Sequence, residues 1–357
     1  SYPLEAAATR YRVEQFVGPL AERGITLKVR PFLDSRLFAS LYRREELPRN
    51  ALGLMGAAMK RFADVWDARG ADVILVQREA MMFGPPVIEW LATRAAKRPM
   101  VLDLDDATYV SYTSPTYGRV GSALKWFSKT DDLIRWSSVV TCGNRFIAEY
   151  VESKGARARV IPTVVDMEKF RPLPKGESKD AVPVIGWVGT HSTFPYLESI
   201  FPALERLAKD FRFRLKVVGA GREHVEVKGV EVESLPWRLA REVEDFQSFD
   251  IGLYPIDTKI YADWTTGKSG FKAIQYMAVG APFVVTPVAA TAEIGEPGMT
   301  HLTASTEDEW RDSLASLLRD AEKRRAMGEA GRRHAVEHYN VPDQADKLAA
   351  ALREATR

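Results

Sequence analysis

The sequence predicts an α/β fold made of two Rossmann-like, doubly wound domains. Short apolar runs rich in valine and isoleucine alternate with amphipathic helical stretches along most of the chain, which is the pattern of a parallel sheet covered on both faces. The alternation stops between residues 164 and 182, where Pro172, Pro174 and Gly176 interrupt all periodicity, and it then starts again. A length of 357 residues also exceeds what one hydrophobic core usually serves.

The first domain is predicted over residues 1–163. It begins with a loop and an amphipathic helix that ends near Gly24, and a strand is predicted at 26–32. A helical, arginine-rich stretch then covers about 35–68. Further strands are predicted at 72–77, 100–106, 138–142 and 158–163, with helices at 85–97, 123–136 and 144–154 between them.

The predicted linker is 164–182, and the second domain is predicted over 183–340. Its strands are expected at 182–189, 214–221, 229–235, 251–254 and 283–286. The chain from Glu307 onward is helical and rich in charge. The helix within 341–357 follows the last element of the second domain, so we expect it to pack back on the first domain.

The composition narrows the class of protein. The net charge is +2 at pH 7, so bulk charge gives no sign of nucleic-acid binding. The single cysteine, Cys142, excludes an intramolecular disulfide and a cysteine-based zinc cluster and fits a reducing compartment. No apolar run approaches the roughly 18–20 residues of a membrane span, and no set of metal ligands stands out. We expect a globular protein located in the cytoplasm. It could also contact the inner face of the membrane.

Residues 250–287 hold the most informative pattern: a strand, a loop, a helix that opens on Gly-Lys-Ser-Gly, and a second strand. Ser269 can cap this helix, and Phe271 lies on the face expected to pack on the sheet. The sector beside that face holds Lys268, Lys272 and Gln275. A helix N-terminus with two ammonium groups suits a phosphate, although solvated lysines on an ordinary amphipathic helix would give the same spacing.

Four segments carry a resemblance to a known family: RVIPTVVDMEKFRP (159–172), VIGWVGT (184–190), GFKAIQYMAVGAPFVVTPV (270–288) and RRAMGEAGRRHAVEHY (324–339). They resemble the retaining, nucleotide-sugar-dependent glycosyltransferases of the GT-B type, family 4, often called group 1. Residues 10–25 are similar to the helix after this family's first strand, and that strand is either missing here or was lost upstream of Ser1. The resemblance implies two Rossmann-like domains that face a crevice.

The sequence departs from this family at the residues that usually hold the donor. The family carries two glutamates eight positions apart, and the corresponding positions here are Gly267 and Gln275. Gln275 can still hydrogen-bond a ribose hydroxyl, and the backbone of Gly267 can approach a ligand closely. The usual phosphate-binding arginine and lysine correspond to Thr190 and Pro195. A diphosphate leaving group still needs positive charge, and we expect Lys268 and Lys272 to supply it.

Further donor contacts are expected where strands of the second domain end. The loop after 182–189 could line the crevice with its amides, and the GxG turn in 217–221 could face the nucleotide. That turn lacks the rest of a dinucleotide fingerprint, which speaks against NAD. Beside the lysines and Gln275, the expected donor-binding residues are Gly189, Thr190, His191, Gly219, Tyr254, Gly267, Ser269, Gly270 and Phe271. For His191, a solvated loop position is the alternative.

The segment LDLDDATY (102–109) admits three interpretations. A metal-binding DxD belongs to a fold with another chain order, and an aspartyl nucleophile lacks the Thr or Val expected two residues after the second aspartate. The resemblance implies a strand end near the acceptor, where Asp105 or Asp106 could accept the proton of the acceptor hydroxyl. The structural alternative is that one of them caps the following turn.

Two segments of the first domain, 43–62 and 123–136, combine basic and apolar side chains. They could lie on an anionic membrane and reach a lipid-linked acceptor. Packing of these helices against the sheet explains the same apolar residues, and this is the interpretation we favour.

The function that the resemblance implies is retaining, metal-independent transfer of a sugar from a nucleotide diphosphate sugar to a hydroxyl acceptor. The acceptor could be a glycan, a lipid-linked sugar or a small molecule, and polysaccharide biosynthesis is the expected process. The donor and the acceptor are then the partners, with no cofactor and no nucleic acid. Two alternatives stay open: a nucleotide-sugar epimerase on the same fold, and an inactive nucleotide-sugar binder, which the loss of both glutamates allows.

Overall fold

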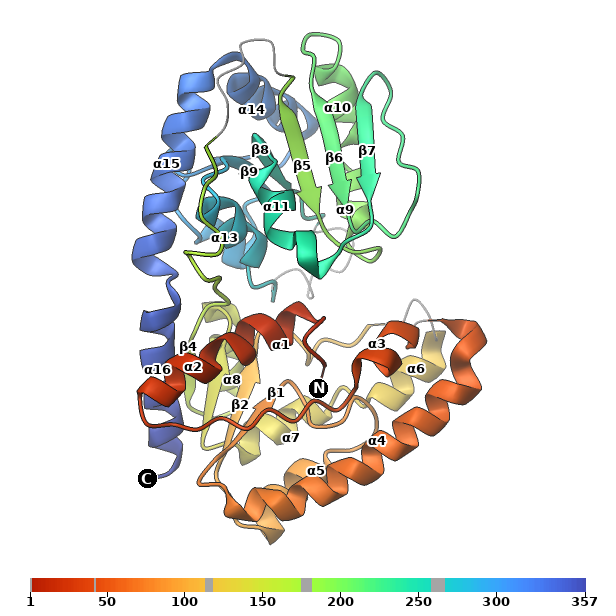
Figure 1. Cartoon of the computed structure of the whole chain (residues 1–357), viewed down its shortest axis with the longest axis vertical. Helices are drawn as coiled ribbons and strands as arrows, with labels where there is room; N and C mark the ends of the chain where they lie inside the picture. The colour runs from red at the N-terminus through yellow and green to blue at the C-terminus, as the bar shows by residue number, and fades with distance from the viewer. Residues whose placement is uncertain (1, 42, 113–117, 175–181, 258–266) are drawn as a thin grey trace. The chain divides into compact units, whose positions relative to one another are not determined.

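The computed structural model describes residues 2–41, 43–112, 118–174, 182–257 and 267–357. The chain divides into two compact units (Figure 1). The first unit comprises the chain up to Thr163 together with Val341–Arg357, and the second unit comprises Val164–Asn340. Each unit has its own parallel sheet, so the predicted α/β class is confirmed.

The first unit is built on four parallel strands in the order β1-β2-β3-β4. Their bounds are β1 Ile74–Gln77, β2 Met100–Leu104, β3 Val139–Cys142 and β4 Ala158–Val160. Every residue of β2 and β3 is buried, which explains why these strands read as continuous apolar runs. The register pairs Gln77 with Asp103 and Leu104 with Cys142. The carboxyl ends of the strands therefore form one edge of the sheet.

Helices surround this sheet. They are α1 Ala7–Arg12, α2 Val17–Glu22, α3 Ser35–Ser40, α4 Leu47–Asp67, α5 Val87–Trp90, α6 Gly118–Lys125, α7 Lys129–Trp136, α8 Arg145–Ser153 and α16 Val341–Ala355. The connecting turns are of 3-10 type at Glu14–Phe16, Arg44–Glu46 and Ala68–Gly70 and of π type at Leu91–Ala95. Leu133 of α7 and Ile147 of α8 are fully buried in the core of the unit. The C-terminal helix α16 packs on α2, β2 and β3.

Three predicted elements of the first unit differ from the structure. Residues 26–32 form no strand. Exposed Lys28 and Arg30 alternate with half-buried neighbours as in a strand, but Pro31 lacks the amide that a ladder needs. The helix predicted at 123–136 is interrupted at Trp126, whose φ of +57° separates α6 from α7. The predicted N-terminal helix is divided into α1, a 3-10 turn and α2.

The apolar residues of α4 do not pack against the sheet, contrary to the interpretation we favoured. Leu52 and Met59 are more than half exposed, and the buried residues of α4 are Asn50 and Arg61. The inner side of the helix, which includes Leu54, packs instead on a small cluster around α3. Among the described residues, no helix has both the length and the apolar character needed to cross a membrane.

The second unit is built on six parallel strands in the order β10-β9-β8-β5-β6-β7. Their bounds are β5 Val184–Val188, β6 Arg214–Val218, β7 Glu231–Leu235, β8 Ile251–Tyr254, β9 Phe283–Val285 and β10 Leu302–Thr303. The chain adds strands outward from β5 to β7 and then from β8 to β10 on the other side. This reversal creates a topological switch point between β5 and β8, and ligands of such sheets bind beyond the carboxyl ends of the strands at that point.

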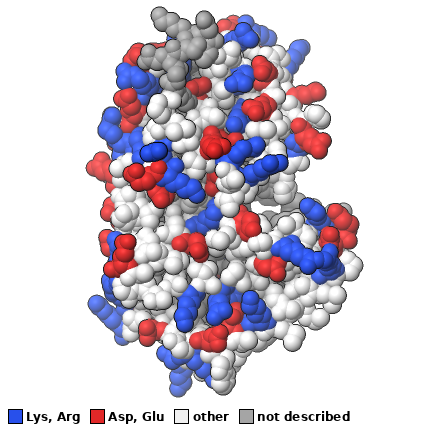
Figure 2. Space-filling model, viewed as in Figure 1, with Lys and Arg blue, Asp and Glu red and all other residues white. Residues whose placement is uncertain are grey.

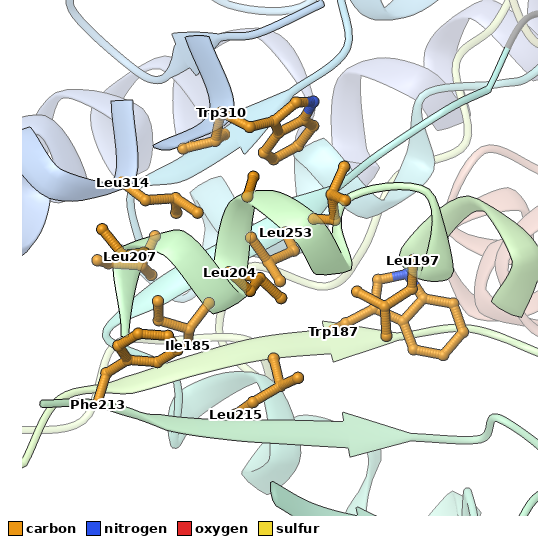
Figure 3. Close-up of a cluster of buried hydrophobic side chains, with 14 of the residues drawn as sticks. Ile185, Trp187, Leu197, Leu204, Leu207, Phe213, Leu215, Leu253, Trp310 and Leu314 are labelled. Atoms are coloured by element: carbon orange, nitrogen blue, oxygen red, sulfur yellow. The ribbon is translucent and has the colours of Figure 1, made fainter. Parts of the chain in front are cut away.

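The helices of the second unit cover its sheet. They are α9 Phe194–Glu198, α10 Phe201–Leu207, α11 Glu242–Gln247, α13 Phe271–Ala278, α14 Glu307–Arg319 and α15 Ala321–His338, with 3-10 turns at Leu239–Arg241 and Ala289–Ala292. Figure 3 shows Leu204 and Leu207 of α10 between Ile185 of β5 on one side and Trp310 and Leu314 of α14 on the other. This layer fixes β5 and therefore the strand end that faces the switch point.

The described part of the predicted linker belongs to the second unit. Val164, Val165 and Phe170 are buried. Arg332 of α15 donates hydrogen bonds to the carbonyl oxygens of Met167 at 2.9 Å and Phe170 at 3.3 Å. Apolar side chains and these hydrogen bonds anchor the segment, so it is not a free connector. The rest of the predicted linker, 175–181, lies outside the described residues.

Candidate functional site

A small pocket lies at the switch point, beyond the carboxyl ends of β5 and β8. Its volume is about 40 Å³. The lining residues are Trp187, Thr193 and Tyr196 from β5 and the segment after it, Tyr254, Pro255 and Ile256 from the end of β8, and Lys268 and Lys272 at the start of α13. Three residues predicted from the sequence, Tyr254, Lys268 and Lys272, are thus brought together in one place.

The two lysines give the pocket its chemistry. Both side chains are half-buried, and Lys272 Nζ lies 5.6 Å from the centroid of the Tyr254 ring, a cation–π contact. Ammonium groups that are partly withdrawn from water attract an anion more strongly than fully exposed ones. With these two ammonium groups on its wall, the pocket suits an anionic oxygen such as that of a phosphate.

The start of α13 depends on glycine. Gly270 is the N-cap residue with φ +66°, in the left-handed region that favours glycine, and a Cβ there would lie 1.9 Å from Ile294 Cδ1. Ser269 is therefore not the cap, contrary to prediction. Gly267 and Gly270 are buried, while Ser269 and Phe271 are half-buried. Without a capping side chain at Gly270, a ligand oxygen can take the place beside the first amides of the helix.

Gln275 lies inside the second unit rather than on the pocket wall. Its side chain is 4% exposed, and it is not among the residues that line the pocket. The predicted sector of Lys268, Lys272 and Gln275 is therefore not one solvent-facing surface. Contact between Gln275 and a ribose stays a prediction.

The loops after β5 and β6 pack closely on each other. A Cβ on Gly219, which has φ +83°, would lie 2.4 Å from the carbonyl oxygen of Gly189. The first loop turns sharply, since the amide of Thr190 donates to Thr193 Oγ1 at 3.0 Å. Thr190 and His191 are exposed. Of this loop, Thr193 reaches the pocket, and the other predicted residues lie at the same edge of the sheet.

Two aromatic residues of the pocket, Trp187 and Tyr196, are among those not predicted from the sequence. Trp187 is 2% exposed and Tyr196 is 6% exposed, so both read as core residues. For Trp187 the sequence does hold one signal, which is the glycine directly after the strand, Gly189. A Cβ on Gly189 would lie 2.1 Å from the Trp187 ring, so that glycine marks where the ring folds toward the strand end.

The pocket is too small for a whole nucleotide sugar, and it has room for a few water molecules or one small polar group. A larger hollow of about 380 Å³ lies along 208–213, Gly229 and Glu231, at the amino ends of β6 and β7. Ligands of parallel α/β sheets bind at the carboxyl ends, so we assign the site to the smaller pocket.

At the corresponding edge of the first unit, Asp105 is tied to an arginine. Arg78 Nε and Nη2 donate to its two carboxylate oxygens at 2.6 and 2.7 Å. Burial alone would raise the pKa of Asp105, but the charge and hydrogen bonds of Arg78 outweigh burial and lower it. Arg78 also has φ +62°, which is uncommon for a residue with a side chain. A carboxylate held in this way is a poor base, so Asp105 does not suit the proton-accepting role.

Asp106 is the other carboxylate of the predicted pair. It is half-buried, and its Oδ1 accepts a hydrogen bond from the amide of Ala107 at 3.1 Å. This is the turn contact that the structural alternative described. Asp106 is therefore the member of the pair that keeps the acceptor-side role as a prediction.

Two further groups of charges are buried at this edge. Arg12 of α1 makes a bidentate ion pair with Asp103 of β2, with Nε 3.0 Å from Oδ2. Glu79 pairs with Lys125 at 2.9 Å and with Lys129 at 2.7 Å. Because each charge is matched by a buried partner, these residues form a framework rather than a binding surface.

Other reactive groups give no competing site. Among the described residues, no cluster of three or more histidine, cysteine, aspartate or glutamate side chains is arranged to hold a metal ion. Cys142 is fully buried, and burial raises the pKa of its thiol to about 12. A thiol in that environment is not a nucleophile.

The region around the pocket matches a known family. Residues 182–320 match the family described as glycosyl transferases group 1. The second unit carries a group 1 glycosyl transferase domain. The match covers most of the second unit, including the lysine pocket. Comparison with curated proteins gives no match.

Solved structures extend the likeness from the second unit to the whole fold. Sucrose-phosphate synthase (tll1590) from Thermosynechococcus elongatus has a TM-score of 0.65 at 15% identity, covering 96% of this chain and 92% of that one. Alr3699/HepE from Anabaena, in complex with UDP, has a TM-score of 0.61 at 16% identity, covering 85% and 84%. A glycosyltransferase from Rickettsia africae ESF-5 has a TM-score of 0.63 at 12% identity, covering 83% and 80%. The two-domain GT-B fold predicted from the sequence is confirmed.

Proposed function

We propose that the chain transfers a sugar from a nucleotide diphosphate sugar to a hydroxyl acceptor, with retention at the anomeric carbon and without a metal ion. The observation that carries this proposal is the lysine pocket at the switch point of a group 1 domain. Solved relatives by fold support the donor class, because Alr3699/HepE was crystallised with UDP and with UDP-glucose. S. aureus TarM was crystallised with UDP, Fondaparinux and alpha-GlcNAc-glycerol, which supports a sugar-bearing acceptor.

In the proposed reaction, the bond between the anomeric carbon and the diphosphate oxygen breaks as the acceptor oxygen bonds to that carbon. Negative charge grows on the leaving diphosphate. Lys268, Lys272 and the first amides of α13 stabilise this charge, and their effect is largest in the transition state because the charge is largest there. The acceptor hydroxyl loses its proton, and we assign Asp106 to this side of the reaction.

The close approach of backbone to ligand follows from the glycines. Gly189, Gly219, Gly267 and Gly270 lie at or near the strand ends of the second unit, where the absence of a side chain lets a ligand approach the backbone closely. We propose that the donor packs against this backbone and contacts Thr190, His191 and Tyr254. A location in the cytoplasm and a role in polysaccharide biosynthesis belong to the same proposal.

The experiment is incubation of the protein with UDP-, GDP- and ADP-sugars and measurement of the released nucleotide diphosphate, with and without a chelator. Slow donor hydrolysis that persists in the chelator supports metal-independent transfer. Interconversion of donors would show an epimerase instead, and tight binding without turnover would show an inactive binder. Once an acceptor is found, the anomeric configuration of the product, measured by proton NMR, tests retention.

A further inference from the structure

The outer face of α4 is an exposed apolar row in the first unit. Leu52, Met55, Met59, Phe62 and Trp66 follow one another at spacings of three and four residues, which places them on one side of the helix. Their side chains are between 49% and 71% exposed. Figure 2 shows mostly uncharged surface at the lower right of the view, along the outer edge where Figure 1 draws α4.

This arrangement reverses the usual amphipathic helix, which turns its apolar side to the core. Here the inner side buries Asn50 and Arg61. Arg61 Nη1 donates there to the carbonyl oxygen of Arg30 at 2.9 Å and to Asp64 Oδ2 at 3.0 Å. Five large exposed side chains present on the order of 500 Å² of apolar surface, a size at which surface patches are often functional.

The segment that carries the row has an excess of basic residues. The segment 43–70 holds six basic and four acidic residues, a balance of +2. The acids of α4 are each matched by an arginine, Asp64 by Arg61 at 3.0 Å and Asp67 by Arg30 at 3.5 Å. Arg69, just beyond α4, stacks its guanidinium 3.8 Å from the centroid of the Trp66 ring.

We propose that the outer face of α4 docks on an anionic lipid surface. An exposed helix face of Leu, Met, Phe and Trp with basic residues at its edges is the composition of helices that lie in a membrane interface. The Trp66–Arg69 pair fits the boundary, where an indole sits at headgroup depth and an arginine reaches toward phosphate. This docking is independent of the proposed sugar transfer.

A second, shorter group of exposed apolar residues lies on α6 and directly after it. Val120 and Leu124 of α6 are exposed, and Trp126 follows them. The segment 81–84 connects the two helices, because Met81, Met82 and Phe83 pack with the inner side of α4 while the amide of Gly84 donates to the carbonyl oxygen of Leu124.

A second copy of the chain is the competing occupant. Stable protein interfaces bury about 800 Å² per partner, and the α4 row alone provides on the order of 500 Å². Lipid has no such minimum, because each apolar side chain that enters the interface contributes separately.

The test attaches a fluorophore to an introduced cysteine, which is possible because the native cysteine is buried and does not react. Cys142 is fully buried, so Met59→Cys introduces one accessible thiol for a polarity-sensitive fluorophore. Met299→Cys, at a 56% exposed methionine of the second unit, is the matched control. We expect phosphatidylglycerol–phosphatidylcholine vesicles to shift the emission of the label at 59 to the blue, with quenching by spin-labelled acyl chains. The label at 299 should not respond.

Loss of function completes the test. Leu52→Gln, Met59→Gln and Trp66→Gln in one chain should reduce co-sedimentation with these vesicles at least tenfold, while circular dichroism and thermal unfolding stay unchanged. Leu239→Gln with Met299→Gln, two exposed positions of the second unit, should leave co-sedimentation unchanged. The proposal is overturned if neither label responds to vesicles. It is also overturned if the triple variant abolishes a dimer, seen by sedimentation velocity, while the wild type ignores lipid.

Discussion

The carboxyl ends of the two sheets occupy equivalent places in their units but are used differently. In the first unit this edge is filled by buried ion pairs, Arg78 with Asp105 and Arg12 with Asp103. In the second unit the edge holds a pocket with two half-buried lysines, Lys268 and Lys272. The same topology therefore gives a charged framework in one unit and a polar cavity in the other.

The residues with left-handed backbone show the same contrast. In the first unit the position after β1 is Arg78, with φ +62°, and its ion pair holds a conformation that costs on the order of 1–3 kcal/mol. In the second unit the corresponding conformations fall on glycines, Gly219 and Gly270. Backbone without side chains leaves room for a ligand, whereas Arg78 fills that space with its own guanidinium. Fold topology alone thus does not identify the chemical side of the molecule.

The largest effect is expected from breaking the framework. Arg12→Ala would leave Asp103 buried with only its neutral neighbours, such as Thr141, whose hydroxyl donates to it at 2.6 Å. Removing one partner of a buried pair costs about 3–5 kcal/mol. Labelling of Cys142 by a thiol reagent under native conditions should therefore accelerate by two to three orders of magnitude, since exposure of β3 requires opening of the first unit.

The matched control for this prediction is Arg325→Ala. Arg325 lies on α15 in exposed pairs with Glu322 and Glu329, and such pairs contribute little. An unchanged labelling rate in Arg12→Ala would show that the framework does not stabilise the first unit.

The second prediction concerns the pocket. Lys268→Ala and Lys272→Ala should each lower donor turnover by about 10²–10³-fold, the range found when one donor to a developing negative charge is removed. The melting temperature should change little, because both side chains are half-buried and do not belong to the core. Lys228→Ala, an exposed lysine of the same unit, is the control. Equal turnover in all three variants would remove the lysines from the proposed mechanism.

The third prediction concerns how the contribution of Asp105 to the free energy of unfolding depends on pH. The pKa of Asp105 is lowered in the folded state, so its contribution is present above the unfolded pKa of about 3.9 and is lost as pH falls through the folded pKa. Wild type and Asp105→Asn should differ in unfolding free energy at pH 7 by about 1–3 kcal/mol, and the difference should shrink below pH 4. Urea unfolding from pH 7 to pH 3 measures it.

Arg78 provides the control for this pH dependence. In an Arg78→Ala background the Asp105→Asn substitution should have a smaller effect at pH 7, because the two side chains act as one unit. A difference that is independent of pH would show that the Asp105 carboxylate does not carry the interaction.

The last prediction compares the effect of an added methyl group at two glycines of the second unit, Gly298 and Gly270, of which Gly270 lies at the start of α13. Gly298→Ala meets no atom within 4 Å and changes only a residue with φ +85°, at a cost of about 1–2 kcal/mol. Gly270→Ala has a similar φ and adds a contact of 1.9 Å with Ile294, so it should cost more and should also weaken donor binding. Isothermal titration with UDP and thermal unfolding of both variants measure the two effects. Equal donor affinity in both would mean that α13 does not contact the ligand.

Much of the fold was predictable because a buried parallel strand appears in the sequence as a short, mainly apolar run. The runs that became β2, β3 and β5 are mainly apolar, with Asp103 and Thr141 as the exceptions, and the structure places each run within the predicted range. The segment 26–32 shows the limit. Its alternation of apolar and charged residues is that of a strand, but whether a ladder partner lies beside it is a tertiary property that periodicity does not contain.

The sequence predicted site residues that lie close together along the chain. It did not predict contacts between residues that are far apart in the sequence. Lys268 and Lys272 lie close in the sequence, so their shared position followed from helix geometry. The Arg78–Asp105 pair joins two strand ends that are 27 residues apart, and the partner of Asp105 could not be read from its neighbours. The burial of Gln275 could not be read from the helical wheel either, because it depends on how α13 packs with the elements around it.

The position of α16 has a consequence for the order in which the chain folds during synthesis. The first unit is discontinuous: it needs residues up to Thr163 and also Val341–Arg357, whose helix packs on α2, β2 and β3. The second unit is continuous from Val164 to Asn340, so all of its strands and helices have left the ribosome before α16 does. The unit that is made first is therefore completed last, and its sheet waits for the final helix of the chain with part of its apolar surface uncovered.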